Sequence, residues 1–274
     1  MMPSSATVGS APGTDSPAEP RVEPAPAIEL RGVSKAYGTA GTALLALDRV
    51  DLAVAPGEFV CLVGASGCGK STLLNLVAGL DRPNAGRVSS LGRSALMFQE
   101  AALFPWLTVA ANVELALRFR GVGRADRRRR GAELLDLVTL GEFATKRPHE
   151  LSGGMRQRVA LARALAQDAE VLLMDEPFGA LDAMTRDLLH DELEALWAHA
   201  GKTVLFVTHN VREAVRLGDR VVLLSSRPGR VAAEFDIALA RPRRIDTAPV
   251  AELAATITDR LREEVRRHAR DDHA

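Results

Sequence analysis

Long hydrophobic segments, net charge and cysteine are all scarce in this chain. Its 274 residues contain 35 basic and 35 acidic side chains and 2 cysteines. Zero net charge gives no overall electrostatic reason to expect nucleic acid as a partner. No apolar run approaches the roughly 18 residues that a membrane-spanning helix needs. A hydrophobic content of 47% still allows a substantial core, so we expect an ordinary soluble globular protein.

The two cysteines, Cys61 and Cys68, lie beside and within a glycine-rich loop. A disulfide there would close a short, strained loop, so we expect free thiols in a reducing compartment. The first 26 residues are rich in Pro, Ala, Ser and Gly and lack the apolar region of a signal peptide. We therefore expect residues 1–26 to form a disordered N-terminal extension, with structure beginning near Ile28.

Strand and helix patterns alternate over most of the chain. An apolar strand, Phe59–Val63, runs directly into the glycine loop Gly64–Thr72, and a helix follows from Lys70 to Val77. Strands and helices alternate again in the segments 171–174, 185–198, 203–207, 211–217 and 221–224. This alternation predicts an α/β fold whose mostly parallel sheet carries helices on both faces.

A helical stretch at about 100–165 interrupts that alternation. Thr108 can cap a helix that continues to Leu117, and residues 132–138 have a second helical pattern. The basic run Arg127–Arg130 stands between them, and we interpret it as a solvated loop or helix face. At 250–274 we expect one charged amphipathic helix, with Leu253, Ile257, Leu261 and Val265 recurring every four residues.

The first glycine loop has the pattern that binds a nucleotide phosphate. Its backbone N–H groups can turn inward toward phosphate oxygens, and the helix that follows adds partial positive charge. Lys70 would reach the β- and γ-phosphates, and the Ser71 hydroxyl would be a ligand of Mg²⁺. Every fixed position of the pattern is present between a strand and a helix, so a chance glycine turn is a poor alternative.

Two acids end the apolar strand 171–174. Asp175 suits a role in holding Mg²⁺, and Glu176 could act as the general base toward an attacking water. A helix-capping or salt-bridged pair is the alternative, and it would be preferred if no phosphate loop were present.

Ser152-Gly153-Gly154 is a second turn that can hold phosphate. Ser152 can cap the helix that follows, and the free N–H groups beyond it favour an anion. No lysine accompanies this turn as Lys70 accompanies the first. We therefore predict that the chain supplies parts of two different nucleotide sites and works as a pair.

Three other residues are ambiguous by themselves. His209 follows the strand 203–207, and a lone histidine there is more often a satisfied structural residue than a catalytic one. Gln99 follows the strand 95–98. Tyr37 could stack on an adenine ring from a loop, and an ordinary surface aromatic is an equal alternative.

Taken together, the motifs resemble the nucleotide-binding subunit of ABC transporters over about 28–240. They are GASGCGKST, Gln99 in MFQE, LSGGMRQR, VLLMDEP, the Ala180-Leu181-Asp182 segment and His209. The resemblance implies a P-loop NTPase (RecA-like) core with an antiparallel β subdomain and an inserted α-helical subdomain, in an ATPase domain at 27–249. It also implies hydrolysis of ATP with Mg²⁺.

The resemblance assigns residues to roles. Tyr37 matches the aromatic that stacks on adenine, and Glu176 and His209 match the catalytic base and the switch histidine. Gln99 resembles the glutamine that contacts Mg²⁺ and the attacking water, and Asp175 the Mg²⁺ aspartate. The loop that binds the phosphates is matched by Gly64, Ala65, Ser66, Gly67, Cys68, Gly69, Lys70, Ser71 and Thr72. Residues that contact the partner's ATP or the dimer interface are matched by Ser152, Gly153, Gly154 and Asp182.

A narrower resemblance concerns four segments. They are Phe104–Thr108, the stretch DEPFGALDAMTR, Leu224–Arg230 and Arg241–Arg244, and they look like the nitrate/sulfonate/taurine-type importers. This resemblance implies a head-to-tail dimer on the cytoplasmic face of the inner membrane, with a separate permease and an extracytoplasmic solute-binding protein.

Other functions remain as alternatives. They are a soluble ABC ATPase acting on DNA or ribosomes, a small-molecule P-loop kinase, an exporter, and an importer of a different solute. The first would need a long coiled coil or a second cassette, which the sequence lacks. The LSGG segment has no role in a kinase.

Overall fold

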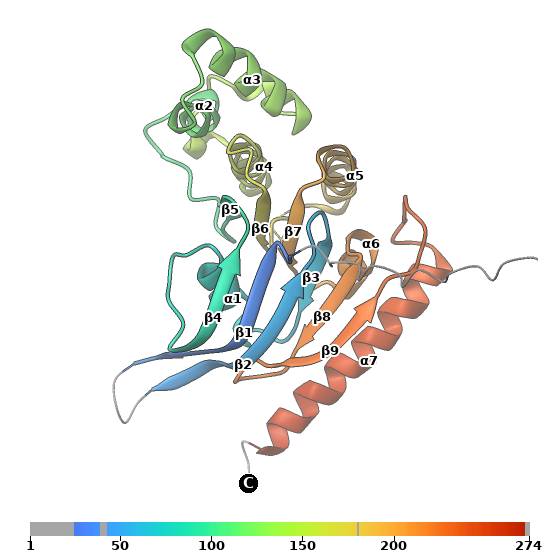
Figure 1. Cartoon of the computed structure of the whole chain (residues 1–274). Helices are drawn as coiled ribbons and strands as arrows, with labels where there is room; N and C mark the ends of the chain where they lie inside the picture. Colours follow the sequence, from blue (N-terminus) through green and yellow to red (C-terminus); the bar gives the residue numbers. More distant parts are fainter. Residues whose placement is uncertain (1–24, 39–42, 180, 272–274) are drawn as a thin grey trace, which may run out of the picture.

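The computed structural model describes residues 25–38, 43–179 and 181–271, which form two sheets and a surrounding set of helices (Figure 1). Almost all of the expected N-terminal extension at 1–26 lies outside these residues, as does Ala180. The first strand among the described residues begins at Ile28, the position near which the sequence predicts structure to begin.

The central sheet has six strands in the order β5-β6-β7-β3-β8-β9. The first five are parallel and β9 is antiparallel, which confirms the predicted mostly parallel sheet. Every residue of β3, β6 and β7 is buried, as expected for strands covered on both faces. The strands are β3 (Phe59–Val63), β5 (Ser94–Met97), β6 (Val171–Asp175), β7 (Thr203–Val207), β8 (Arg220–Leu224) and β9 (Val231–Asp236).

A smaller antiparallel sheet has the order β2-β1-β4, with strands β1 (Ile28–Tyr37), β2 (Leu44–Val54) and β4 (Ala85–Ser90). Its buried side chains, among them Leu30, Val50 and Leu52, share one core with β3 and with helix α1 (Lys70–Val77). Helix α1 contacts strands of both sheets. The glycine loop that precedes α1 is therefore held from two sides.

The helical insertion consists of α2 (Val109–Phe119), α3 (Arg124–Leu137) and α4 (Gly153–Leu165), with short 3₁₀ turns at Gly141–Phe143 and Pro148–Glu150. Figure 1 shows α2 and α3 at the opposite end of the molecule from α7. Thr108 caps α2 as predicted, because its hydroxyl accepts from the Ala111 N–H at 3.1 Å. Helix α3 begins at Arg124, earlier than the helical pattern at 132–138 predicts, so the run Arg127–Arg130 lies on this helix. The interpretation of the run as a solvated helix face is confirmed.

Three helices complete the chain: α5 (Ala183–Ala200), α6 (Val211–Leu217) and α7 (Ala248–Asp271). The predicted apolar face of α7 holds at Ile257 and fails at Val265, which is 44% exposed, whereas Glu264 is buried. A four-residue spacing turns by about 40° per step on a helix of 3.6 residues per turn, so the series rotates away from the core. Arg267 and Arg260 pair with the Glu264 carboxylate at 3.1 and 3.4 Å.

Within the described part of the chain, no helix has both the length and the apolar character to cross a bilayer. The longest, α7, instead packs on α6 through a face that includes Val250, Ala254 and Ile257.

Candidate active site

A cavity of about 420 Å³ opens at the glycine loop, next to the carboxyl ends of the central strands. Open α/β sheets bind their ligands at this edge. Half of the predicted site residues, nine of eighteen, lie in its lining. The lining residues are Tyr37, Leu44, Ala46, Ser66, Gly67, Gly69, Lys70, Ser71, Thr72, Gln99, Glu176 and Arg227.

Gly69 shows why the loop needs glycine. Its φ is +101°, and a Cβ there would lie 2.9 Å from the Ala46 carbonyl oxygen and 2.7 Å from the Leu47 side chain. Any other residue would combine strain with a backbone clash. Gly69 is also the N-cap of α1 and has no side chain over the helix end. The free N–H groups of α1 therefore face the cavity without a competing cap.

Lys70 brings a positive charge to the cavity although its side chain is nearly buried. Its Nζ donates to the carbonyl oxygens of Gly64 and Ala65, each at 2.9 Å. Both acceptors belong to the same loop, so a bound phosphate could take over these donors without moving the strand below.

Both cysteines are free thiols, as the sequence predicts, and the structure shows that both are buried. Burial raises the pKa of the Cys68 thiol, and nearby Lys70 opposes that shift. The pKa of Cys61 is likewise raised by burial. Neither thiol is set up as a nucleophile at neutral pH.

Asp175 and Ser71 supply the oxygens that suit a magnesium ion. Asp175 ends β6, and its carboxyl lies beside the Ser71 side chain of helix α1. Burial raises the pKa of Asp175, which the Ser71 side chain and Lys70 partly oppose. A divalent cation would relieve the same burial penalty, so this donor pair fits a hard, oxygen-preferring ion.

Glu176 and His209 face one another. They follow β6 and β7, which are neighbouring strands of the central sheet. His209 Nδ1 lies 3.0 Å from Glu176 Oε2. Glu176 has a φ of +45°, a sparsely populated conformation for a residue with a side chain. Its N–H donates to the Val207 carbonyl at 3.0 Å, which holds the backbone in that conformation. Backbone strain of this kind is concentrated at active sites, where it orients a side chain toward the ligand.

Tyr37 is the last residue of β1, not a loop residue as its interpretation assumed. It lines the cavity and is 41% exposed. Its hydroxyl donates to Asp81 Oδ2 at 3.1 Å, and Lys35 Nζ lies 4.9 Å from the ring centre. The ring is therefore fixed at one edge and leaves a face for a planar group.

Gln99 reaches the cavity from the segment after β5, and α4 holds that segment in place. The buried Gln157 of α4 donates to the Gln99 carbonyl oxygen. Arg163, also on α4, donates to the carbonyls of Ala101 and Ala102 at 3.0 and 2.8 Å. Movement of α4 would therefore move the backbone of Gln99.

The Ser152 turn and Asp182 do not line this cavity, among the residues the structure describes. Each instead caps a helix. Ser152 accepts from the Met155 N–H at 3.2 Å, and Asp182 accepts from the Thr185 N–H at 3.0 Å. The latter hydrogen bond lowers the pKa of Asp182.

Arg227 is a cavity residue that the sequence did not identify. It lies between β8 and β9, and its guanidinium Nε and Nη2 each lie 3.4 Å from the Gly67 carbonyl oxygen. Leu224–Arg230 stands out in the sequence only as a subfamily feature. Nothing in its spacing indicates that it would return to a loop 160 residues earlier.

The arrangement combines an anion-binding loop, two cations, a pair of oxygen donors suited to Mg²⁺ and a carboxylate beside a histidine. Binding of a nucleoside triphosphate and activation of a water molecule next to it are the chemistry that these groups support together.

Comparison with known proteins agrees with this chemistry. Residues 47–179 match the family model described as "ABC transporter". A taurine import ATP-binding protein, TauB of Rhizobium johnstonii, is 47% identical over 82% of this chain and 89% of its own length. The chain belongs to the ABC transporter family.

Other ABC proteins match over comparable lengths. The aliphatic sulfonates import ATP-binding protein SsuB 1 of Mesorhizobium japonicum is 46% identical over 88% of this chain and 90% of its own. A solved structure, the dimeric post-hydrolysis state of the ATP-binding cassette MJ0796 bound to ADP and Pi, aligns with a TM-score of 0.73. It has 35% identity, and the match covers 78% of this chain and 100% of that one. The ABC cassette fold predicted from the motifs is therefore confirmed.

Proposed function

We propose that this chain is the ATP-hydrolysing subunit of an importer for a small anion of the sulfonate or taurine class. The observation that carries the proposal is the single cavity in which Lys70, Ser71, Gln99 and Glu176 meet beside a glycine loop. The solute class is supported by relatives named for taurine and aliphatic sulfonate import.

Each side chain has a role in the proposed reaction, ATP + water to ADP + phosphate. Lys70 and the loop N–H groups neutralise the phosphate oxygens, and Tyr37 stacks on the adenine ring. Glu176 accepts a proton from the attacking water, while His209 and Gln99 orient the γ-phosphate and that water. Ser71 and Asp175, with Gln99, would hold a Mg²⁺ ion, which supplies positive charge against the phosphates when bound.

Two copies act together in this proposal, head to tail. The Ser152 turn of one copy completes the nucleotide site formed by the Lys70 loop of the other, with Asp182 at the interface. The dimeric cassette relative and the absence of the Ser152 turn from the described cavity lining support this arrangement.

A second cavity supports the proposed permease partner. It measures about 670 Å³ and has an apolar lining with three arginines, Arg93, Arg120 and Arg163. Phe104 and Phe119 line it and are exposed, and Trp106 packs on Phe104 with ring centres 5.5 Å apart. A groove of this kind suits a helical segment of a membrane permease. The chain would then lie peripherally on the cytoplasmic face of the inner membrane, and a solute-binding protein would act through the permease from outside.

The test is Glu176→Gln, which keeps the shape of the side chain and removes the base. We expect phosphate release to fall by roughly 10²- to 10⁴-fold while ATP still binds and a stable dimer accumulates. Phosphate release and size-exclusion chromatography in saturating ATP measure both results. The proposal would be contradicted by a Glu176→Gln variant that is active or stays monomeric. It would also be contradicted if the wild-type protein phosphorylated an acceptor and released no free phosphate.

The solute is tested separately with the co-purified complex. We expect taurine or alkanesulfonates to raise the melting temperature of its binding protein in a thermal-shift assay. Stabilisation by an unrelated solute alone would refute the solute class and leave the ATPase assignment intact.

A further inference from the structure

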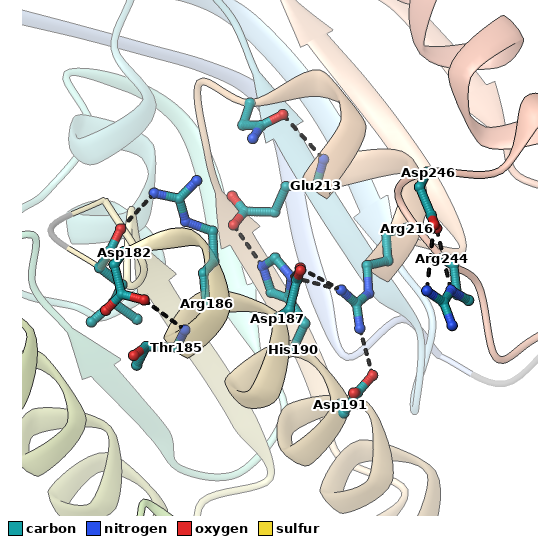
Figure 2. A network of polar contacts seen from close by, with 12 residues as sticks. Asp182, Thr185, Arg186, Asp187, His190, Asp191, Glu213, Arg216, Arg244 and Asp246 are labelled. Carbon is teal, nitrogen blue, oxygen red and sulfur yellow. Dashed lines mark hydrogen bonds and ion pairs between the residues drawn. The ribbon is translucent and has the colours of Figure 1, made fainter.

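A buried chain of polar side chains lies directly behind the His209 loop. It comprises Thr208, Glu213, His190 and Arg216, and the last three are 4%, 0% and 5% exposed. Figure 2 shows the His190 ring between the Glu213 carboxylate and the Arg216 guanidinium. The residues come from the end of β7, from α6 and from α5, so the chain joins three elements.

The partners of His190 fix the position of its proton. Arg216 Nη1 lies 3.1 Å from His190 Nδ1. Because a guanidinium can only donate, Nδ1 must accept, and the ring proton is on Nε2. His190 Nε2 then donates to Glu213 Oε1 at 2.7 Å. His190 thus links Arg216 to Glu213, because one ring nitrogen accepts a hydrogen bond and the other donates one.

The other oxygen of Glu213 holds the residue before His209. The Thr208 hydroxyl donates to Glu213 Oε2 and accepts from the Asn210 N–H at 3.0 Å. The Asn210 side chain caps α6 by accepting from the Arg212 and Glu213 N–H groups at 3.1 and 3.3 Å. Both neighbours of His209 are therefore tied to the network.

The same network also contacts the segment that carries Glu176. The Phe178 ring packs edge-on against His190 with ring centres 5.0 Å apart. At its outer end Arg216 pairs with Asp187 and Asp191 of α5, so its charge lies beside two exposed carboxylates. Removing one member would leave a buried partner unsatisfied, so the network holds together or fails as a unit.

We propose that Thr208, Glu213 and His190 are positioning residues that hold His209 where its imidazole meets Glu176. The proposal rests on the function proposed above. None of the three lines the nucleotide cavity. Their loss therefore slows hydrolysis without weakening ATP binding.

The direct test is Thr208→Val, which preserves shape and removes the hydroxyl. We expect kcat to fall about 10- to 100-fold with little change in KM for ATP, because a small displacement of a catalytic group has effects of this size. Thr208→Ser retains the hydroxyl and should keep kcat near the wild-type value. A second pair of variants tests His190. Gln in His190→Gln offers both a donor and an acceptor, so this variant should stay active, whereas His190→Leu should not.

Asp191→Asn is the matched control. Its side chain touches Arg216 but lies 69% exposed at the outer end of the network, so kcat should stay within about twofold of wild type. Thermal unfolding and nucleotide binding of each variant separate lost positioning from lost folding.

Equal kcat for the Val and Ser variants at Thr208, or for the Gln and Leu variants at His190, would overturn the inference. The inference would also be overturned if a rise in KM for ATP accounted for the whole loss of kcat/KM. If Thr208→Val does not fold, the His190 pair decides. The proposed function is tested separately. If the wild-type protein hydrolyses ATP and Glu176→Gln abolishes this activity, the proposed function is supported in every one of these cases.

Discussion

Asp175 carries its charge where burial works against it. Burial raises the pKa of its carboxyl, so the folded chain binds the proton more tightly than the unfolded chain does. The ionised carboxylate therefore lowers the free energy of unfolding at neutral pH. This cost disappears as the pH falls through the folded-state pKa.

We accordingly predict that Asp175→Asn raises the melting temperature of the nucleotide-free protein at pH 7, although it removes a proposed Mg²⁺ ligand. The gain should shrink as the pH falls, and calorimetry over a pH series measures it.

Asp182→Asn gives the opposite sign, because the Thr185 N–H lowers the pKa of Asp182. That carboxylate stabilises the fold above its unfolded pKa, and the contribution is lost as the pH falls through the folded value.

A lower melting temperature for Asp175→Asn at pH 7 would refute the argument.

Arg227 leads to a prediction about nucleotide affinity. Its guanidinium lies at the Gly67 carbonyl and lines the cavity, so we expect it to contact a phosphate bound by the glycine loop. Arg227→Gln should raise KM for ATP by about tenfold, the usual effect of losing a charged hydrogen bond. Arg230→Gln is the control, because Arg230 pairs with Asp48 and does not line the cavity. Equal changes in KM for the two variants would exclude a specific role for Arg227.

At the scale of elements, the buried strands and the helices beside them could be predicted well. The predicted bounds 59–63, 70–77, 203–207 and 211–217 match β3, α1, β7 and α6. Strand β3 is an uninterrupted apolar run and β7 is one after Thr203, so composition alone identifies them. Strands β4 and β9 were missed because they are mostly exposed or half-buried and have no apolar alternation.

The site divides in the same way between local and distant contacts. The glycine loop, Asp175 and Glu176 could be predicted because short motifs adjoin apolar strands. Arg227 and the pairing of His190 with Glu213 could not, because those contacts join segments 160 and 23 residues apart. Only the packing of α5 and α6 on the sheet brings the latter pair together.

At the scale of the whole molecule, the Lys70 loop and the Ser152 turn predict different effects on binding and turnover. Ser152→Ala should reduce hydrolysis strongly and leave ATP affinity of the monomer almost unchanged. Fluorescent-nucleotide binding at low protein concentration and phosphate release at high concentration make the comparison. Ser71→Ala, which alters the cavity itself, should weaken both.

Loss of the helix cap must be separated from loss of the second site. Ser152→Ala removes a cap worth about 1 kcal/mol, whereas Ser152→Asn can retain it. Hydrolysis lost in both variants would therefore not reflect fraying of α4. Equal loss of binding and hydrolysis in Ser152→Ala would place both turns in one site.

Helix α3 has an unusual position in this architecture, since only Gly131 and Leu135 of its 14 residues are buried. Its ion pairs, such as Arg129 with Asp126 and Glu133, are exposed to solvent and therefore stabilise the helix only weakly. The backbone amides of α3 should therefore exchange with deuterium roughly tenfold or more faster than those of α4, through local opening. This outermost helix can then unfold and re-form on a faster timescale than helix α1, which begins at Lys70, and strand β6, which ends at Asp175.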